Sequence, residues 1–321
     1  MSNAAPALSL DETAALTRRI TRLSVSTALV LSAVKLAAWL LSGSVAMLAS
    51  LADSGLDVVA ALAAYFAVRY AVEPPDHEHR FGHGKAEAFA SLVQAGLVFA
   101  SAALVGREAI DHILHPHPIA YQGWSLAVMA LSVVLTSALI WGQTRVLARA
   151  KSVAVSGDRT HYIADLASNV IAFLAIGASA LLASPVPDAI GGLAVAVLLL
   201  WGAIGVFRAS TVELMDHELD DESRARIAQL VRADPRVRDV HQLRTRASGP
   251  YIHVQMHAEL DPTMTLVEAH KVMVAAENRV LEAFPAADII IHPDPRGQAE
   301  PHGGAFAEDH AVERIGTARR A

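Results

Sequence analysis

The chain has 321 residues, of which 53% are hydrophobic and only 18% are charged, and its mean hydropathy is +0.37. Soluble domains usually carry charge on about a quarter of their residues, so this composition excludes an ordinary soluble protein. The net charge of −6 comes without a basic arm or a basic aromatic patch, so nucleic acid is not an expected partner. Cysteine is absent, which excludes disulfides and thiolate metal sites and leaves His, Asp and Glu as the strong metal ligands.

Apolar runs long enough to cross a bilayer recur in the first two thirds of the chain, since about 20 apolar residues span the hydrocarbon core. Residues 1–20 are acidic and polar and lack the pattern of a cleavable signal peptide. They are therefore predicted to form a cytoplasmic segment before a first span that is retained. The predicted transmembrane domain occupies residues 21–208, with six spans at 21–42, 44–70, 86–108, 123–146, 161–183 and 187–207.

Positively charged residues predict the orientation of these spans, because cytoplasmic loops carry an excess of Lys and Arg. The connections on one side contain only Arg107. The connections and span ends on the other side contain ten such residues, namely Arg18, Arg19, Arg22, Arg69, Arg80, Lys85, Arg145, Arg149, Lys151 and Arg159. Both termini are therefore predicted to be cytoplasmic.

The second and fifth predicted spans each carry two ligand-type side chains at a spacing of four. Asp53 and Asp57 lie in the second span, and His161 and Asp165 lie in the fifth. Residues i and i+4 share one face of a helix, and a carboxylate at mid-bilayer costs about 2.5–3.5 kcal/mol. A divalent cation would satisfy all four groups, and protons could replace it, so the pattern predicts a metal carrier. The alternative is a polar contact between helices, but neither span carries a basic partner deep inside it.

The loop after the second span carries another group of ligand-type residues. Asp76, His79 and His83 follow the pattern D-x2-H-x3-H. Imidazole and carboxylate groups suit a metal site, although many cytoplasmic loops are equally polar and their histidines are simply hydrated. From these residues alone, both interpretations stay open.

Residues 209–294 have the composition of a separate, charged, soluble domain. Its expected elements are helices at 221–232 and 266–284 and strands at 237–246, 251–260 and 287–292. Alternate residues from Ile252 to Leu260 are apolar, which predicts a half-buried antiparallel sheet in an α+β domain of order αββαβ. Residues 295–321 are rich in Pro, Gly and charge and are predicted to be a disordered tail.

Histidines recur in separate elements of this domain, together with one aspartate: His241, His257, His270, His292 and Asp294. Scattered imidazoles usually lie on the surface, so these residues alone do not decide between a metal site and a hydrated face. No P-loop is present, so ATP is not expected to drive the protein. The string HELDDE at 217–222 lacks the second His of an H-E-x-x-H zinc protease, and an enzyme is not predicted.

The order of these motifs resembles the cation diffusion facilitator family, and most closely its bacterial zinc and ferrous-iron efflux branch. The resemblance runs from around residue 15 to residue 295, and rests on the two spaced pairs, on FGHGKAEA, and on HQLRTRASGP, VQMHAEL, VEAH and IIIHPDP. In that family, six transmembrane helices precede a cytoplasmic, metallochaperone-like and ferredoxin-like α+β domain that contributes to a homodimer. The resemblance implies the same fold, a homodimer and a place in the cell inner membrane for this chain.

The resemblance also assigns the ligand-type residues to sites. The residues that match a tetrahedral transport site are Asp53, Asp57, His161 and Asp165, and those that match a second site in the loop are Asp76, His79 and His83. A binuclear site in the cytoplasmic domain is matched by His241, His257, His292 and Asp294, and there His270 also matches a ligand. Lys85 and Asp216 match a charged pair near the dimer contact.

Three aspartates and a histidine suit a tetrahedral ion of borderline softness, so Zn²⁺ is the expected cargo, with Fe²⁺ and Cd²⁺ as alternatives. Metal ligands must lose their protons, so alternating access is expected to exchange the metal for protons, without an organic cofactor. A rival interpretation is a membrane-anchored metal receptor or buffer that does not transport. An intramembrane metalloenzyme is a weaker rival, because no general-base motif accompanies the ligands.

Overall fold

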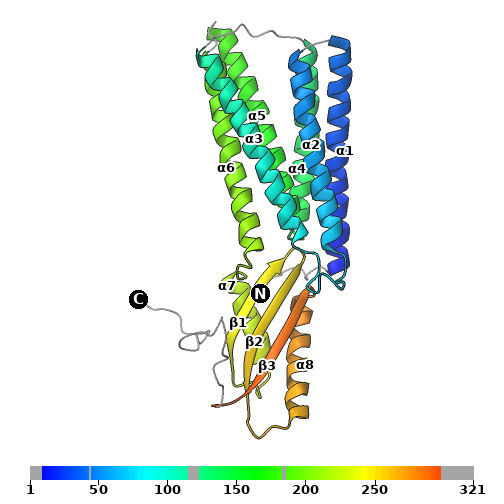
Figure 1. Cartoon of the computed structure of the whole chain (residues 1–321), viewed down its shortest axis with the longest axis vertical. Coiled ribbons are helices and arrows are strands. Elements are labelled where there is room, and N and C mark those ends of the chain that lie inside the picture. The colour runs from blue at the N-terminus through cyan, green and yellow to red at the C-terminus, as the bar shows by residue number, and fades with distance from the viewer. Residues whose placement is uncertain (1–8, 43–44, 115–122, 183–185, 298–321) are drawn as a thin grey trace, which may run out of the picture. The chain divides into compact units, whose positions relative to one another are not determined.

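The computed structural model describes residues 9–42, 45–114, 123–182 and 186–297, apart from the side chains of some residues within its helices. The chain forms two compact units, one from Asp11 to Leu214 and one that contains the residues from Met215 onward. Long helices make up the first unit, and a three-stranded sheet with two helices makes up the second (Figure 1). From position 298 onward, the predicted disordered tail lies outside the described residues.

Six helices form the first unit, in the order that the hydropathy pattern predicts. They are α1 Leu10–Ser42, α2 Val45–Ala71, α3 Ala86–Leu114, α4 Gly123–Leu147, α5 Val153–Leu182 and α6 Val186–Leu214. The shortest has 25 residues and the longest 33, which is enough to cross a core of about 30 Å at a rise of about 1.5 Å per residue. All but α5 contain a described stretch that is also apolar enough to cross, and α5 carries Asp158, Arg159 and Asp165 in its first half.

Two helices begin earlier than the apolar runs indicate. α1 begins at Leu10 rather than at residue 21, and α5 begins at Val153 rather than at residue 161. The first turn of α1 carries Asp11 and Glu12, whose negative charge favours a helix N-terminus. Both helices therefore extend beyond their apolar spans, where a hydropathy pattern does not mark the end of a helix.

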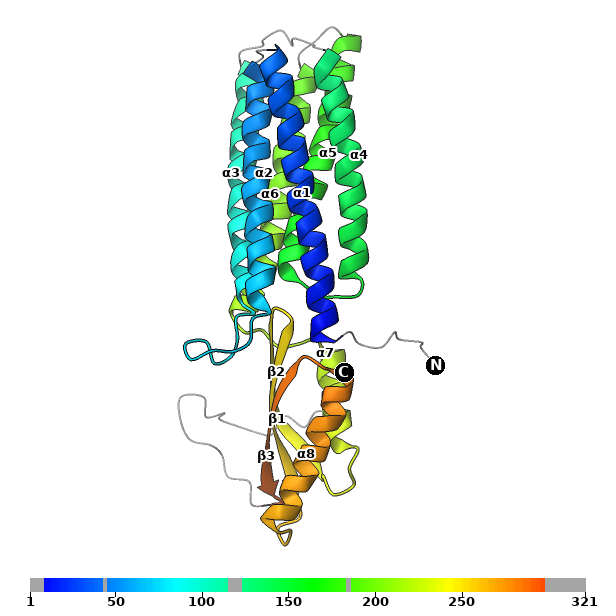
Figure 2. The same cartoon turned by 90° about the vertical axis from the view of Figure 1, so that its right-hand side faces the viewer.

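Small residues let the helices approach closely. α3 packs against α6, and a Cβ atom added at Gly192 of α6 would lie 2.9 Å from the Cβ of Ala109 in α3. Small side chains of this kind are common where helices meet inside membranes, because packing rather than the hydrophobic effect holds the helices together there. α5 contacts both α6 and α2 (Figure 1 and Figure 2), so side chains on one face of α5 can meet those of α2.

The second unit has the predicted order of elements. They are α7 Asp221–Arg232, β1 Asp239–Ser248, β2 Tyr251–Leu260, α8 Leu266–Ala283 and β3 Ala287–Pro295, and the strand order in the sheet is β1-β2-β3. β1 and β2 are antiparallel, but β2 and β3 are parallel. The prediction of an antiparallel sheet is therefore wrong for β3. The chain passes through α8 between these two strands, and a helical crossover returns it in the same direction.

Both helices of the second unit cover the same face of the sheet. Ile227 and Val231 from α7 and Val272 from α8 form one buried core with Val254 and Met256 from β2. Successive side chains on a strand point to opposite faces. The residues that alternate with this core on β2 are therefore directed away from the helices.

Asp234, which follows α7, binds Arg236 through both of its carboxylate oxygens. Oδ1 accepts hydrogen bonds from the backbone nitrogen of Arg236 at 3.0 Å and from its Nε at 2.9 Å, and Oδ2 accepts one from Nη2 at 2.7 Å. These bonds lower the pKa of Asp234 from 3.8 to about 2. Because the folded-state pKa lies below the unfolded value, the stabilisation is present above about pH 4 and is lost as the pH falls toward about 2.

We predict that Asp234→Asn lowers the free energy of unfolding of the second unit by about 1 kcal/mol at pH 7. This loss is smaller than the pKa shift alone would imply, because Arg236 is exposed and solvent screens the ion pair. The difference from wild type should shrink as the pH is lowered from about 4 to about 2.5. Pulse proteolysis of the intact chain in urea at several pH values measures it. Glu282→Gln, at an exposed position, serves as the control and should show no deficit. A deficit that does not change with pH would contradict the role given to the Asp234 carboxylate.

Candidate metal sites

The ligand-type residues of α2 and α5 meet inside the helical unit. Nε2 of His161 lies 2.9 Å from Oδ1 of Asp57 and 3.5 Å from Oδ2 of Asp165. The exposed fractions of the three side chains are 11% for His161, 15% for Asp57 and 31% for Asp165. Asp53 lies one turn before Asp57 on α2, but its side chain is outside the described residues. The structure thus brings together three of the four residues predicted for this site.

The spacing of these ligand atoms suits a single tetrahedral ion. Each of the three residues offers a ligand atom, and these atoms all lie within 4.8 Å of one another. Zinc binds nitrogen and oxygen at about 2.0–2.2 Å, so neighbouring ligands of a tetrahedral zinc ion lie about 3.3–3.6 Å apart. The separations from His161 are 2.9 Å and 3.5 Å. A slight opening of the contact between His161 and Asp57 would therefore admit the ion.

Packing on both sides of His161 holds α5 in this orientation. Tyr162 is buried in a cluster with Val68 of α2. Ala164 is buried in another cluster with Val98 of α3 and residues of α6. Since these neighbours of His161 are held by different helices, rotation of α5 about its axis would disrupt two cores, and the imidazole stays directed at the carboxylate of α2.

A buried polar network, which is not among the predicted features, lies beside this site. Asp158 of α5, three residues before His161, is only 1% exposed. Its Oδ1 accepts a hydrogen bond from Nε2 of Gln94 in α3 at 3.1 Å, and its Oδ2 accepts one from Nε2 of Gln143 in α4 at 2.7 Å. A buried carboxylate is tolerated only where donors satisfy it, so the network holds α5 against α3 and α4. The i, i+3, i+7 spacing of Asp158, His161 and Asp165 could have indicated this residue.

Removing the amide of Gln143 is expected to destabilise the helical unit. Gln143→Leu deprives Oδ2 of Asp158 of a donor, and an unsatisfied buried polar group costs about 1–3 kcal/mol. We predict a lower midpoint of thermal unfolding for the purified variant in detergent. Thr144→Val, at the exposed neighbouring position, should change the midpoint little. Equal midpoints for Gln143→Leu and wild type would show that the network does not stabilise the bundle.

The loop between α2 and α3 holds a second group. Oδ1 of Asp76 lies 3.4 Å from Nδ1 of His79, and Oδ2 lies 3.3 Å from Nε2 of His83. Backbone N–H groups of His79 and Glu78 also donate to Oδ1, and the bond from His79 contributes most to holding the pKa of Asp76 below its usual value. The side chain of His83 is buried, whereas those of Asp76 and His79 are about half exposed. An ion bound by these three residues would therefore be open to solvent.

Three histidines form a row across the sheet of the second unit. His241 on β1 is paired with His257 on β2, which is paired with His292 on β3. Asp294 lies two residues after His292 and therefore on the same face of β3. Its Oδ2 lies 3.1 Å from Nε2 of His241 and 2.9 Å from Nδ1 of His257, and its Oδ1 lies 3.3 Å from Nε2 of His292. One carboxylate thus contacts three imidazoles.

The histidine at one end of this row is buried. Val240 and His241 face opposite sides of β1 and are both buried, so both faces of the strand are covered at this point. A β-bulge follows them, where the pairing of β1 with β2 shifts between His241 and Arg244 and Gln242 has a φ of 48°. At the other end of the row, the side chain of His292 is 54% exposed. The group is closed at β1 and open to solvent at β3.

The electrostatics of β2 favour a neutral imidazole at the centre of this row. Burial holds the pKa of His257 below its usual value, although the hydrogen bond to Asp294 acts in the opposite direction. A neutral imidazole can bind a metal ion without first losing a proton. His253, on the same strand, instead has Asp288 as its partner, with Nδ1 3.1 Å from Oδ2.

Two of the predicted assignments do not fall in these groups. Among the described residues, the three groups of ligand atoms do not include His270. His270 is exposed on α8, and α8 covers the face of the sheet opposite to that of His257.

Lys85 and Asp216 belong to different units. Nζ of Lys85 donates to the carbonyl oxygen of Leu214 at 3.3 Å, and Oδ2 of Asp216 accepts from Nη1 of Arg246 at 3.1 Å. The roles of His270, Lys85 and Asp216 stay predictions.

Comparison with known proteins identifies relatives for both units. The family model of the cation efflux transmembrane domain matches residues 21–215, and that of the cation efflux protein cytoplasmic domain matches residues 219–296. The chain is 40% identical over 280 residues to the cation-efflux pump FieF of Shewanella oneidensis, which covers 87% of this chain and 94% of the relative. FieF of Klebsiella pneumoniae is 36% identical over 281 residues, with 87% and 93% covered. FieF of Escherichia coli is 37% identical over 262 residues, with 82% and 87% covered.

These matches confirm the predicted family, the fold class, the inner-membrane location and the expectation that the protein is not an enzyme. The six helices form the membrane domain, and the second unit is the cytoplasmic domain. Both family descriptions and the names of these relatives give cation efflux as the activity of the family. The chain belongs to the cation efflux family, the cation diffusion facilitators, in the branch of the bacterial FieF pumps.

Proposed function

We propose that this protein exports Zn²⁺ from the cytoplasm in exchange for protons, by alternating access to the site of Asp57, His161 and Asp165, with Asp53 as the fourth ligand. The observation that carries this proposal is the contact of His161 on α5 with the carboxylate of Asp57 on α2, at 2.9 Å, and with that of Asp165 on its own helix, at 3.5 Å. Such groups are costly inside a bilayer. An ion that binds all of them offsets that cost, and its release requires another positive species in its place.

The donor set supports zinc as the cargo. Carboxylates and an imidazole suit an ion of borderline softness with tetrahedral geometry. Mg²⁺ and Ca²⁺ prefer about six or more oxygen ligands, and the chain has no cysteine for a thiolate-demanding ion such as Cu⁺. Fe²⁺ and Cd²⁺ remain alternatives, because affinity order alone does not separate them from zinc.

Proton exchange follows from the chemistry of these ligands. They must be deprotonated to bind the metal, so metal release and protonation are linked. Imidazole is the side chain that titrates nearest to physiological pH. His161 is therefore the proposed first proton acceptor when the metal leaves toward the outside. The return of the protonated site would then carry protons toward the cytoplasm.

The histidine row of the cytoplasmic domain is proposed as a binuclear site that stabilises a homodimer when cytoplasmic zinc rises. The two oxygens of Asp294 face different imidazoles, which suits a carboxylate that bridges two ions. The exposed side chain of His292 leaves room for water or a further ligand. The loop group of Asp76, His79 and His83 is proposed as an additional zinc site open to solvent.

Flux measurements in proteoliposomes test the transport proposal. External Zn²⁺, Fe²⁺ and Cd²⁺ are offered separately across a pH gradient, and the saturable uptake rate of each is compared with that of protein-free vesicles. We expect the ratio of the maximal uptake rate to the half-saturation concentration to be highest for Zn²⁺. A membrane-anchored receptor or buffer would bind these ions at its cytoplasmic groups and show no flux above that of empty vesicles.

A further inference from the structure

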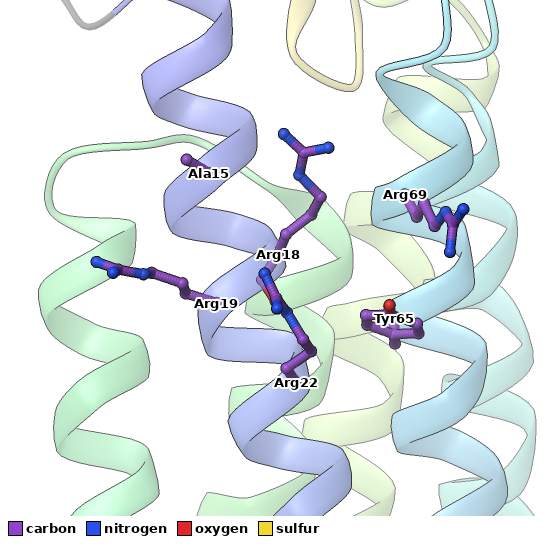
Figure 3. A pocket seen from close by; sticks show the side chains of 6 residues that line it. All are labelled: Ala15, Arg18, Arg19, Arg22, Tyr65 and Arg69. Atoms are coloured by element: carbon purple, nitrogen blue, oxygen red, sulfur yellow. The ribbon is translucent and has the colours of Figure 1, made fainter.

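A basic pocket lies between α1 and α2, near the first turns of α1. It has a volume of about 360 Å³ and is lined by Ala15, Arg18, Arg19, Arg22, Tyr65 and Arg69. In Figure 3, Arg18 and Arg22 extend from α1 into the space between the two helices, and Tyr65 extends from α2 toward them. Arg69 lies one turn further along α2, whereas Arg19 extends from the other side of α1.

This pocket lies at the cytoplasmic end of the bundle. The end of α6 leads into the cytoplasmic domain, and successive helices cross the membrane in alternate directions. α1 therefore begins, and α2 ends, on the cytoplasmic side. Arg69 is two residues from the end of α2. The polar layer beyond each side of the hydrocarbon core is about 5–8 Å thick, so this end of the bundle is at the level of the lipid headgroups.

The positive charge of the pocket is not neutralised by the protein. Nε of Arg18 donates to the carbonyl oxygen of Ala14 at 3.0 Å, and Nε of Arg22 donates to that of Arg18 at 3.2 Å. Over the described ranges, none of the four lining arginines is in an ion pair with a carboxylate. Like charges that line one pocket repel one another, and a bound anion would weaken that repulsion.

We propose that this pocket binds the phosphate group of an anionic phospholipid from the cytoplasmic leaflet. Guanidinium groups bind phosphate oxygens through paired N–H donors, and the hydroxyl of Tyr65 supplies a further donor. Leu23 follows Arg22, and Phe66 follows Tyr65, and their exposed fractions are 47% and 59%. These apolar surfaces next to the pocket suit acyl chains, which distinguishes a lipid from free inorganic phosphate. The bound lipid would link α1 to α2, the helix that carries Asp57.

The test uses the full chain in nanodiscs of phosphatidylcholine with an increasing fraction of phosphatidylglycerol. Lipids retained after transfer to the gas phase are identified by native mass spectrometry. A basic residue near an anionic headgroup contributes about fivefold in affinity. In the double variant Arg18→Gln/Arg69→Gln, the preference for phosphatidylglycerol over phosphatidylcholine should therefore be about 25-fold lower than in the wild type. Arg145→Gln/Arg149→Gln removes the same charge near the cytoplasmic end of α4, outside the pocket, and should keep that preference.

A second arm titrates inorganic phosphate onto the protein in pure phosphatidylcholine nanodiscs, where the proposal expects no saturable binding. The opposite outcome is saturable phosphate binding by the wild type, lost in Arg18→Gln/Arg69→Gln, together with no preference for phosphatidylglycerol. That outcome would assign the pocket to a soluble anion and overturn the lipid proposal. An equal loss in both double variants would also overturn it, since general surface charge would then explain the preference. If the pocket variant does not fold, Arg22→Gln alone should cost about fivefold, and an unchanged preference in that variant would refute the site.

Discussion

Replacing Asp165 with alanine is expected to abolish zinc transport while the protein remains folded. The change removes the carboxylate whose Oδ2 lies 3.5 Å from Nε2 of His161, so the proposed site keeps at most three ligands. Loss of a residue that only supports a metal ligand costs about 10–100-fold. Loss of a ligand itself should therefore lower the initial rate of zinc uptake into proteoliposomes by about 100-fold or more.

Two further variants make this result specific to the site. Glu108→Ala removes a carboxylate from an exposed position of α3 and should transport at the wild-type rate. Asp165→Glu keeps the charge but displaces it by one methylene, and should retain more transport than the alanine variant. Zinc binding by the cytoplasmic domain should persist in Asp165→Ala and report that this domain is folded, and an unchanged midpoint of thermal unfolding in detergent should report that the helical unit is folded. Undiminished zinc uptake by Asp165→Ala would refute the assignment of this residue.

Replacing Asp294 with alanine is expected to remove most of the zinc binding by the cytoplasmic domain and to leave substantial transport. The carboxylate contacts His241, His257 and His292, so its removal takes away the group that the three imidazoles share. We expect the affinity of the domain for zinc to fall by about 100-fold or more. Competition with a zinc-binding dye, on the intact chain that also carries Asp165→Ala and Asp76→Ala, measures this affinity without a contribution from the transport site or from the loop group.

Asp288→Ala is the matched control for this change. Asp288 contacts His253 at 3.1 Å on the same sheet, so the variant also removes an aspartate from a histidine but lies outside the proposed site. Its zinc affinity should equal that of the parent. Equal losses in the two variants would indicate a general effect on the sheet. Loss of all flux in Asp294→Ala on the wild-type background, with normal zinc-dependent dimerisation, would contradict a regulatory role.

Local signals explain why the helices of the cytoplasmic domain could be predicted closely. α7 has the predicted bounds, and α8 begins at the predicted Leu266. Thr265 and Glu268 form a capping box at this start, which is a pattern of neighbouring residues that a sequence displays directly. The direction of β3 and the bulge at Gln242 depend instead on how distant segments pair. Alternation along one strand does not specify the direction of its neighbour, so these features could not be predicted.

The transport site could be predicted in part for a similar reason. The spacing of His161 and Asp165 places them on one face of α5, and their type is unusual within a membrane span. Asp158 has the same character, but its partners Gln94 and Gln143 are neutral residues on two other helices. Neutral polar residues are common at contacts between membrane helices. The network therefore becomes visible only when α3, α4 and α5 are placed together.

The coupling of zinc and proton fluxes in the wild-type protein tests the account most directly. Proteoliposomes with an acidic lumen receive external Zn²⁺, and dyes report lumenal zinc and lumenal pH together. We predict that zinc accumulates while the lumen becomes more alkaline, and that both signals are lost in His161→Ala. A rate of zinc entry that does not depend on the pH gradient, with no change in lumenal pH, would contradict metal and proton exchange at the site of Asp57, His161 and Asp165.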